Sequence, residues 1–240
     1  MFSQQRPSKA LTFLLTLSLL FTLVLSAPVY SQKKLEADSC TWKSTAIDRK
    51  KVKNRALKAD RYPEHNNGEA ITVSEFYDLV CSFDAPAKKD IVEMTPIADL
   101  EEQTVTVRGF LVAAKFERGQ DHDIHAQLAA SKEWDQDQLI IEVPAGGKYC
   151  PVRKALWGLV RTDRKNSGSK SKGDTIRFAE PPKVTVTGYL FLDAHHITKK
   201  TTPAKYCIAN GGRGLQKDGK SSVRGLWELH PVIALTAIPQ

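Results

Sequence analysis

From Glu102 onward, apolar and polar residues alternate in five segments, each short enough to be a single β-strand. A period of two places every second side chain on the same face of a strand. The first segment carries Gly109 at its middle, which predicts a bend or bulge and lets one long strand serve both halves of a closed sheet. The five expected strands are 104–117, 123–128, 138–144, 184–193 and 226–237.

One helix is predicted among these strands, at 152–161. Pro151 suits the first helical turn, and Leu156 and Val160 fall on one apolar face. Three strands, a helix and two strands, with a bent first strand, is the order of an OB-fold. We therefore predict a mainly β fold with some α structure, a five-stranded OB-fold-like Greek-key barrel with one internal helix over 102–240. An antiparallel sandwich is the alternative, and the internal helix argues against it.

The region before the barrel, 32–101, is predicted to be a helical N-terminal extension. Sparse apolar positions at helical spacing indicate one helix within 44–60. Thr72 or Ser74 can cap a second, short helix that ends near Cys81. The first of these helices is strongly basic, which suits either phosphate contacts or an ordinary solvated face.

The N-terminus has the layout of a secretory signal peptide over 1–31. Arg6 and Lys9 precede an uncharged apolar run at 10–25, and small residues lead to a cleavage site after Ser31. An uncleaved membrane anchor is the alternative, although the run is shorter than the ~20 residues of a spanning helix. The sequence holds no second run of that length, so we expect no transmembrane segment after cleavage. The predicted location is periplasmic or extracellular.

Four cysteines are spread along the chain, and none forms a C-x-x-C motif. In an exported chain, an even number at wide spacing favours disulfides over metal binding, with buried thiols as the alternative. The four are Cys40, Cys81, Cys150 and Cys207. Three connectivities are possible. We favour Cys40–Cys81 together with Cys150–Cys207, because each pair then closes one region of the chain.

Two strands carry a carboxylate and a histidine two positions apart, so each pair shares a face. Such pairs could ligate a divalent metal or form the acid–base group of a hydrolase, but they also occur as ordinary buried hydrogen-bonded pairs. The candidate catalytic residues are Asp123, His125, Glu228 and His230. The candidate metal ligands are His125, His195, His196 and His230. The favoured interpretation assigns no cofactor, and a divalent metal belongs to the alternative.

Two loops, at 163–174 and 197–225, are basic and rich in glycine and serine. Without residues 1–31 the chain has 33 basic and 27 acidic residues, a net charge of +6. This moderate excess permits an anionic ligand such as a glycan, a nucleic acid or an acidic protein. The candidate ligand-binding residues are Lys165, Lys170, Lys172, Lys199, Lys200, Tyr206, Arg213 and Lys217.

Nucleic-acid binding would also need exposed aromatic side chains on which bases can stack. Tyr206 is the loop candidate for this role. Tyr189, Phe191 and Trp227 lie within apolar strands and are expected to be buried.

Four short blocks occur in a fixed order along the barrel region. They are D-I-H-A-Q-L at 123–128, I-I-E-V-P at 140–144, V-T-G-Y-L-F-L-D at 186–193 and W-E-L-H-P-V at 227–232. Together they resemble a family of small exported bacterial proteins marked by D-x-H, E-V-P, V-T-G and E-L-H-P-V blocks. The resemblance covers about 104–238 and implies an OB-fold-like structure and export rather than a particular activity. The loop at 197–225 is longer than in that family, which also lends no support to residues before 104.

The common catalytic motifs G-x-S-x-G and H-E-x-x-H are missing from the sequence, as are the Walker loop and a helix-opening G-x-G-x-x-G. We therefore favour an exported, disulfide-stapled OB-fold-like binding protein over an enzyme. The alternative is a metal-dependent hydrolase with a His/Asp/Glu cluster. It requires His125 and His230 to converge beside a solvent cleft, whereas a binding protein requires a continuous basic groove. A structural envelope protein would show neither feature.

Overall fold

The computed structural model describes residues 40–41, 43, 69–83, 100–119, 121–134, 137–167, 175–197, 206 and 223–239. The predicted signal peptide and the helix expected within 44–60 lie outside these residues. So do six of the candidate ligand-binding residues, namely Lys170, Lys172, Lys199, Lys200, Arg213 and Lys217. Of the expected helical extension, the described residues hold one helix.

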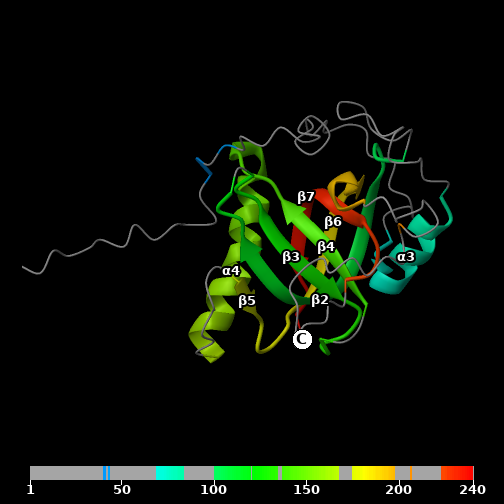
Figure 1. Ribbon diagram of the computed structural model, residues 1–240. Coiled ribbons are helices and arrows are strands. Elements are labelled where there is room, and N and C mark those ends of the chain that lie inside the picture. The colour runs from blue at the N-terminus through cyan, green and yellow to red at the C-terminus, as the bar shows by residue number, and fades with distance from the viewer. Residues whose placement is uncertain are drawn as a thin grey trace, which may run out of the picture. The chain divides into compact units, whose positions relative to one another are not determined.

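Five strands form a closed barrel in the order β2-β3-β4-β7-β6, and β6 pairs back onto β2 (Figure 1). The β4–β7 pair is parallel, and the other four pairs of the barrel are antiparallel. The strands are β2 (Thr104–Phe116), β3 (Ile124–Ala129), β4 (Gln138–Val143), β6 (Lys183–Leu192) and β7 (Trp227–Ala237). All five expected strands are confirmed, with bounds that differ by one residue at most.

The bend of β2 is what closes the barrel. Its first half pairs with β6 and its second half with β3, and Phe110 pairs with both neighbours. A Cβ atom on Gly109 would lie 2.6 Å from the carbonyl oxygen of Ala129, so only glycine allows this close approach. The pairing shifts register between Leu111 and Ala113, which marks a bulge beside the bend. The prediction of a bent first strand is confirmed.

The short helix α3 (Val73–Cys81) begins as the sequence predicts. Thr72 Oγ1 accepts a hydrogen bond from the Glu75 amide at 3.2 Å, and the Glu75 carboxylate accepts one from the Thr72 amide at 2.6 Å. This reciprocal capping box satisfies two amides that the helix cannot. Immediately before it, β1 (Ile71–Thr72) runs parallel to β2 at the sheet edge. The helix buries Val73, Phe76, Tyr77 and Val80.

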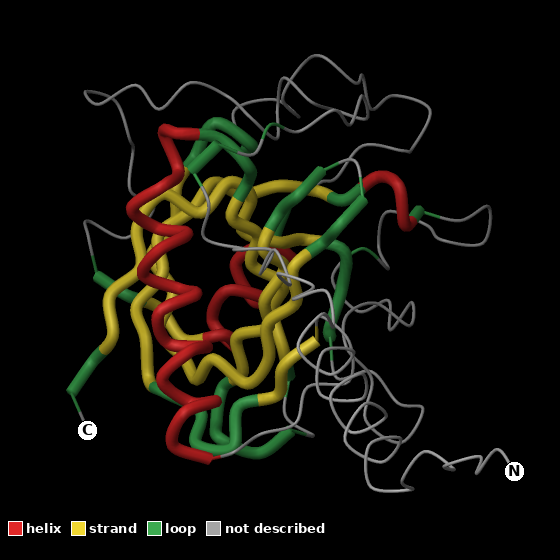
Figure 2. The backbone as a smooth tube through the Cα atoms, turned by 90° about the vertical axis from the view of Figure 1, so that its left-hand side faces the viewer, coloured by secondary structure: helices red, strands yellow, loops and turns green. Residues whose placement is uncertain are grey.

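The internal helix α4 (Cys150–Ser167) runs beside the ring of strands on the side away from α3 (Figures 1 and 2). It buries Val152, Leu156 and Val160 against the barrel. None of the described helices is both long and apolar enough to cross a membrane.

The helix is longer than predicted, so Lys165 lies in α4 and not in a loop. The last turn of α4 has no apolar residues at helical spacing, so the sequence does not predict it. Just before that turn, the Asp163 carboxylate accepts hydrogen bonds from the amides of Ala179 and Glu180, and these bonds join the helix to the chain that follows β5. That strand, β5 (Thr175–Arg177), pairs with the second half of β2 and was not expected.

Inside the barrel lies a continuous apolar core to which every barrel strand contributes. Tyr206 belongs to this core, since it is only 1% exposed and its carbonyl accepts a hydrogen bond from the Leu226 amide. The expectation of a solvent-facing Tyr206 is therefore wrong. Tyr189, Phe191 and Trp227 are buried, as predicted.

A disulfide joins Cys40 to Cys150, the first residue of α4, with Cα atoms 5.1 Å apart. Cys81 is disulfide-bonded as well, and Cys207 lies outside the described residues. The pairing favoured from the sequence is wrong, because Cys40 reaches a partner 110 residues away and not Cys81. Proximity in sequence is a poor guide here, since the fold decides which cysteines meet.

Candidate metal site

Alternate residues of β3, β4 and β7 point to opposite sides of the barrel wall. Ile124, Ile141 and Leu229 face inward and belong to the apolar core. The residues that alternate with these three along each strand therefore face outward. In the sheet, His125 pairs with Glu142 and Ile141 pairs with Leu229, so the outward side chains of the three strands are neighbours. The outward residues that carry titratable groups are Asp123, His125, Glu142, Glu228 and His230.

Glu142 bridges the two histidines. Its Oε1 lies 2.8 Å from His125 Nδ1, and its Oε2 lies 2.7 Å from His230 Nδ1. Glu228 Oε1 lies 3.4 Å from the same nitrogen of His230. His125 and His230 converge on this shared carboxylate, as the hydrolase hypothesis requires, but the solvent cleft that it also requires is not shown among the described residues.

Sequence reasoning missed Glu142 as a site residue. It stands in the E-V-P block, but no histidine lies two positions away to draw attention to it. The available signal was the succession of the second and third predicted strands, which pair in the structure with Glu142 directly opposite His125. Finding Glu142 from the sequence would have required the register between two strands, and the spacing of residues within one strand is not enough.

Asp123 approaches His230 from the start of β3. Its Oδ2 lies 3.7 Å from His230 Nε2, and its Oδ1 accepts a hydrogen bond from the Ala145 amide at 3.0 Å. Asp123, Glu142 and His230 each offer a ligand atom, and these atoms all lie within 4.8 Å of one another. Ligand atoms around a four-coordinate zinc ion, with bonds of about 2.1 Å, are roughly 3.4 Å apart. Glu142 faces Nδ1 of His230 and Asp123 faces Nε2, so the three groups would have to draw together around one ring nitrogen to bind one cation.

Solvent reaches this cluster from one side. The side chains of His230 and Glu228 are 0% and 1% exposed, whereas those of His125 and Glu142 are each 15% exposed. The Phe191 ring lies 5.3 Å from the His230 ring, between centroids, and adds an apolar neighbour. The cluster is thus a nearly enclosed polar site with an edge at His125 and Glu142.

Three carboxylates and two imidazoles make up the cluster, so carboxylates outnumber imidazoles, and the nearby buried guanidinium of Arg153 is bonded to backbone carbonyls. Burial raises the pKa of Asp123 to about 7, against the opposing charge of His230, and the charges of Glu142 and Asp121 raise it further. Burial also raises the pKa of Glu142, but the charge of His230 and the hydrogen bonds from both histidines hold it well below its usual range. In the metal-free protein, a proton on Asp123 relieves the excess negative charge. A divalent cation would supply the same relief.

The other histidine candidates lie elsewhere. His195 and His196 form the short helix η3 (Ala194–His196) after β6, and their rings contact each other 5.7 Å apart. Asp193 accepts a hydrogen bond from the His195 amide, and its Oδ2 lies 3.5 Å from His196 Nε2. Among the described residues, the group that could hold a metal ion consists of Asp123, Glu142 and His230. The structure does not bring His195 or His196 into it.

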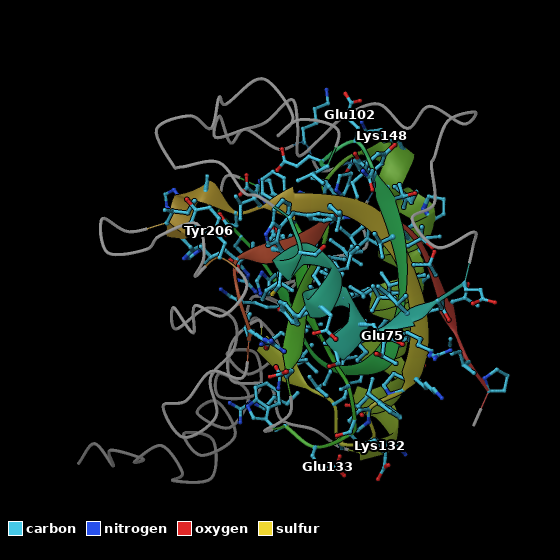
Figure 3. All side chains as sticks on the ribbon, turned by 90° about the vertical axis from the view of Figure 1, so that its right-hand side faces the viewer. Glu75, Glu102, Lys132, Glu133, Lys148 and Tyr206 are labelled. Atoms are coloured by element: carbon cyan, nitrogen blue, oxygen red, sulfur yellow. A yellow bond between two sulfur atoms is a disulfide. The ribbon has the colours of Figure 1, made fainter. Side chains whose placement is uncertain are left out.

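The site lies at the end of the barrel where β3 begins and β4 ends. Figure 3 shows Lys148, on the connection that follows β4, at this end, and Lys132, on the connection between β3 and β4, at the opposite end. Two surface cavities lie away from the cluster. One of about 470 Å³ is lined by Ile71, Glu75, Asp78 and Leu79. One of about 380 Å³ is lined by Leu159, Thr162, Asp163, Phe178, Ala179, Glu180 and Pro182.

Comparison with known proteins does not assign the chain to a family. No protein-family model matches the chain, and no curated protein matches its sequence. The candidate site therefore stands on its geometry and charge.

Proposed function

We propose that this chain is an exported OB-fold-like protein that binds one divalent metal ion through Asp123, Glu142 and His230. The convergence of the three ligand atoms within 4.8 Å, in a nearly enclosed site where carboxylates outnumber imidazoles, carries the proposal. Burying ionised groups is costly unless they are paired or bound to a metal, so a bound cation would stabilise the charge that the two imidazoles leave uncompensated.

The order of elements supports the OB-fold assignment. Three strands precede α4 and two follow it in the closed barrel, and the long first strand bends to serve both halves. In OB-folds the ligand face lies on the second and third strands, which here are β3 and β4. His125 and Glu142 lie on the outer side of these strands, so the proposed metal site falls on that face. This step rests on analogy of fold.

Membership of the family of small exported bacterial proteins remains a proposal based on the four sequence blocks. Three of those blocks supply all five titratable residues of the cluster. Export is compatible with the disulfide between Cys40 and Cys150, because disulfides persist in oxidising compartments.

Two carboxylates and one imidazole suit zinc or manganese, and three protein ligands leave a coordination position for water. The test is metal content by elemental analysis, with zinc titration of the EDTA-treated protein. The key variant is Glu142→Gln, which keeps the shape and removes the charge. The matched control is His196→Ala, whose side chain is 48% exposed and lies outside the cluster.

We expect about one metal ion per chain in the wild type and in His196→Ala. Glu142→Gln should bind zinc at least about tenfold more weakly, since a ligating carboxylate becomes a neutral amide. A metal-free wild type that takes up no added zinc or manganese would rule the proposal out.

A metal-dependent hydrolase is the second candidate, favoured by the position of His125. This imidazole sits at the solvent edge and is hydrogen-bonded to a proposed ligand, where it could accept a proton from an attacking water. The metal would supply a bound water of lowered pKa. p-Nitrophenyl esters and phosphate esters provide a first screen. Turnover that falls about 100-fold or more in His125→Gln, at unchanged metal content, would support an enzyme.

An anionic ligand of the basic loops, whether a glycan, a nucleic acid or an acidic protein, also remains a proposal. Its candidate lysines and Arg213 lie outside the described residues, except for the backbone of Lys165. The burial of Tyr206 removes the aromatic side chain on which base stacking would have depended.

A further inference from the structure

We infer that Arg153, a residue of α4 that sequence reasoning assigned no role at the cluster, is a positioning residue for the metal site, and this inference rests on the function proposed above. Its side chain is fully buried. Nη1 donates to the carbonyl oxygens of His122 and Val143, at 3.1 Å each. His122 immediately precedes Asp123, and Val143 immediately follows Glu142. One guanidinium nitrogen therefore ties together the two chain segments that carry two of the three proposed ligands.

This tie lies where the pairing of β3 with β4 ends. The last pair of the β3–β4 ladder is Ile124 with Val143, so Asp123 lies one residue beyond it. Past that point, the Ala145 amide holds Asp123 Oδ1, and Arg153 holds the carbonyl before Asp123. Together with the Glu117 amide, which donates to the Asp123 carbonyl at 2.9 Å, these contacts hold Asp123 where it approaches His230.

His122 shows that the backbone next to Asp123 is constrained. Its φ of 55° is in the left-handed region, which residues with a Cβ rarely adopt. The Arg153 hydrogen bond to its carbonyl and the stacking of its ring on Phe116, 6.3 Å between centroids, both favour this conformation. Loss of the guanidinium would remove one of these contacts and free the backbone that precedes a proposed ligand.

The helix that carries Arg153 is well anchored. Its first residue is bonded to Cys40, and Val152 and Leu156 pack in the core on either side of Arg153 in sequence. A helix that contributes no ligand thus sets the spacing between Asp123 and Glu142. Residues that orient ligands in this way usually change metal affinity about 10–100-fold when they are replaced.

The test compares Arg153→Met with Leu156→Ala, a core variant one turn along the same helix that removes packing but no hydrogen bond. Both are studied as full chains at temperatures where each is folded. Zinc affinity is measured by competition with a chromophoric chelator, and the geometry of the site by the visible spectrum of the cobalt-substituted protein. Arg153→Lys, which keeps a cationic donor, is the conservative variant.

We expect zinc affinity to fall about 10–100-fold in Arg153→Met, with a changed cobalt spectrum and partial recovery in Arg153→Lys. Leu156→Ala should keep the wild-type affinity and spectrum. Wild-type affinity in Arg153→Met, or equal losses in both variants, would overturn the positioning role and leave the metal site standing. A wild type that binds neither zinc nor cobalt would overturn both proposals.

Discussion

The inner and outer faces of β3, β4 and β7 both hold buried side chains, but the inner face is apolar and the outer face carries the cluster of carboxylates and imidazoles. Ile124, Ile141 and Leu229 on the inner face are 0% exposed, as is His230 on the outer face. Burial of the inner side chains stabilises the fold in proportion to their apolar area. Burial of carboxylates and imidazoles costs free energy that only pairing or a bound cation offsets. Burial alone therefore does not distinguish a structural residue from a functional one. Burial that stabilises the fold indicates a structural residue, and burial that costs free energy indicates a functional one.

The largest expected effect is a loss of stability on replacing a residue of the inner face, with no change in metal binding at the outer face. Leu128→Ala removes a fully buried inner side chain of β3, which packs against Gly109. We expect it to lower the free energy of unfolding by about 3–5 kcal/mol, because it leaves a cavity in the core. Zinc affinity of the folded variant should stay at the wild-type value. Urea denaturation and zinc titration check both, and a parallel loss of affinity would mean that the faces are not independent.

A second test uses Asp123, whose burial should make the metal-free protein less stable at high pH. The pKa of this carboxyl is about 7 in the folded chain and near 3.8 in the unfolded chain. Between these values the folded state holds a proton that the unfolded state has lost, so stability falls as pH rises through this window. Asp123→Asn cannot ionise. At pH 8 in EDTA it should be more stable than the wild type by about 2–4 kcal/mol.

The difference between Asp123→Asn and the wild type should shrink at pH 5, where Asp123 is protonated in the folded wild type. Urea denaturation at pH 5, 6.5 and 8 measures it. Glu142 does not interfere in this range, because its lowered pKa stabilises the fold above pH 4.5 and that contribution is lost only below. Identical pH dependence in the variant and the wild type would contradict the raised pKa of Asp123.

The smallest expected effect concerns the outer side of β2 and β6, away from the cluster. Thr106 on β2 and Thr187 on β6 are paired, with their hydroxyl oxygens 2.9 Å apart. Thr187→Val should lower stability by about 0.5–1 kcal/mol, the usual size of a cross-strand pair, and leave zinc affinity unchanged. Thermal denaturation and zinc titration measure the two quantities. A change in affinity would show that the outer face acts as one unit and not as a local site.

Much of the fold was predictable because it depends on short-range rules. Alternation gave the strands, Gly109 marked the bend, and Thr72 marked the start of α3. The same rules placed Asp123 with His125, and Glu228 with His230, on one face of a strand. In the structure Glu228 does lie beside His230, whereas Asp123 approaches His230 and His125 contacts Glu142. The short-range rules failed for β5, which is three residues long, and for the polar last turn of α4.

The tertiary structure decided four features. They are the bridging role of Glu142, the hydrogen bonds of Arg153, the disulfide between Cys40 and Cys150 and the burial of Tyr206. Each depends on two segments that are distant in sequence and meet only when the barrel closes. A periodic pattern records which face of a strand a residue occupies, because neighbouring residues alone fix that. It does not record which strand or helix lies opposite, because that choice is made by the packing of the whole core. The sequence by itself therefore determined the strands and the face on which each histidine and carboxylate lies, and the tertiary structure decided which of these side chains contact one another.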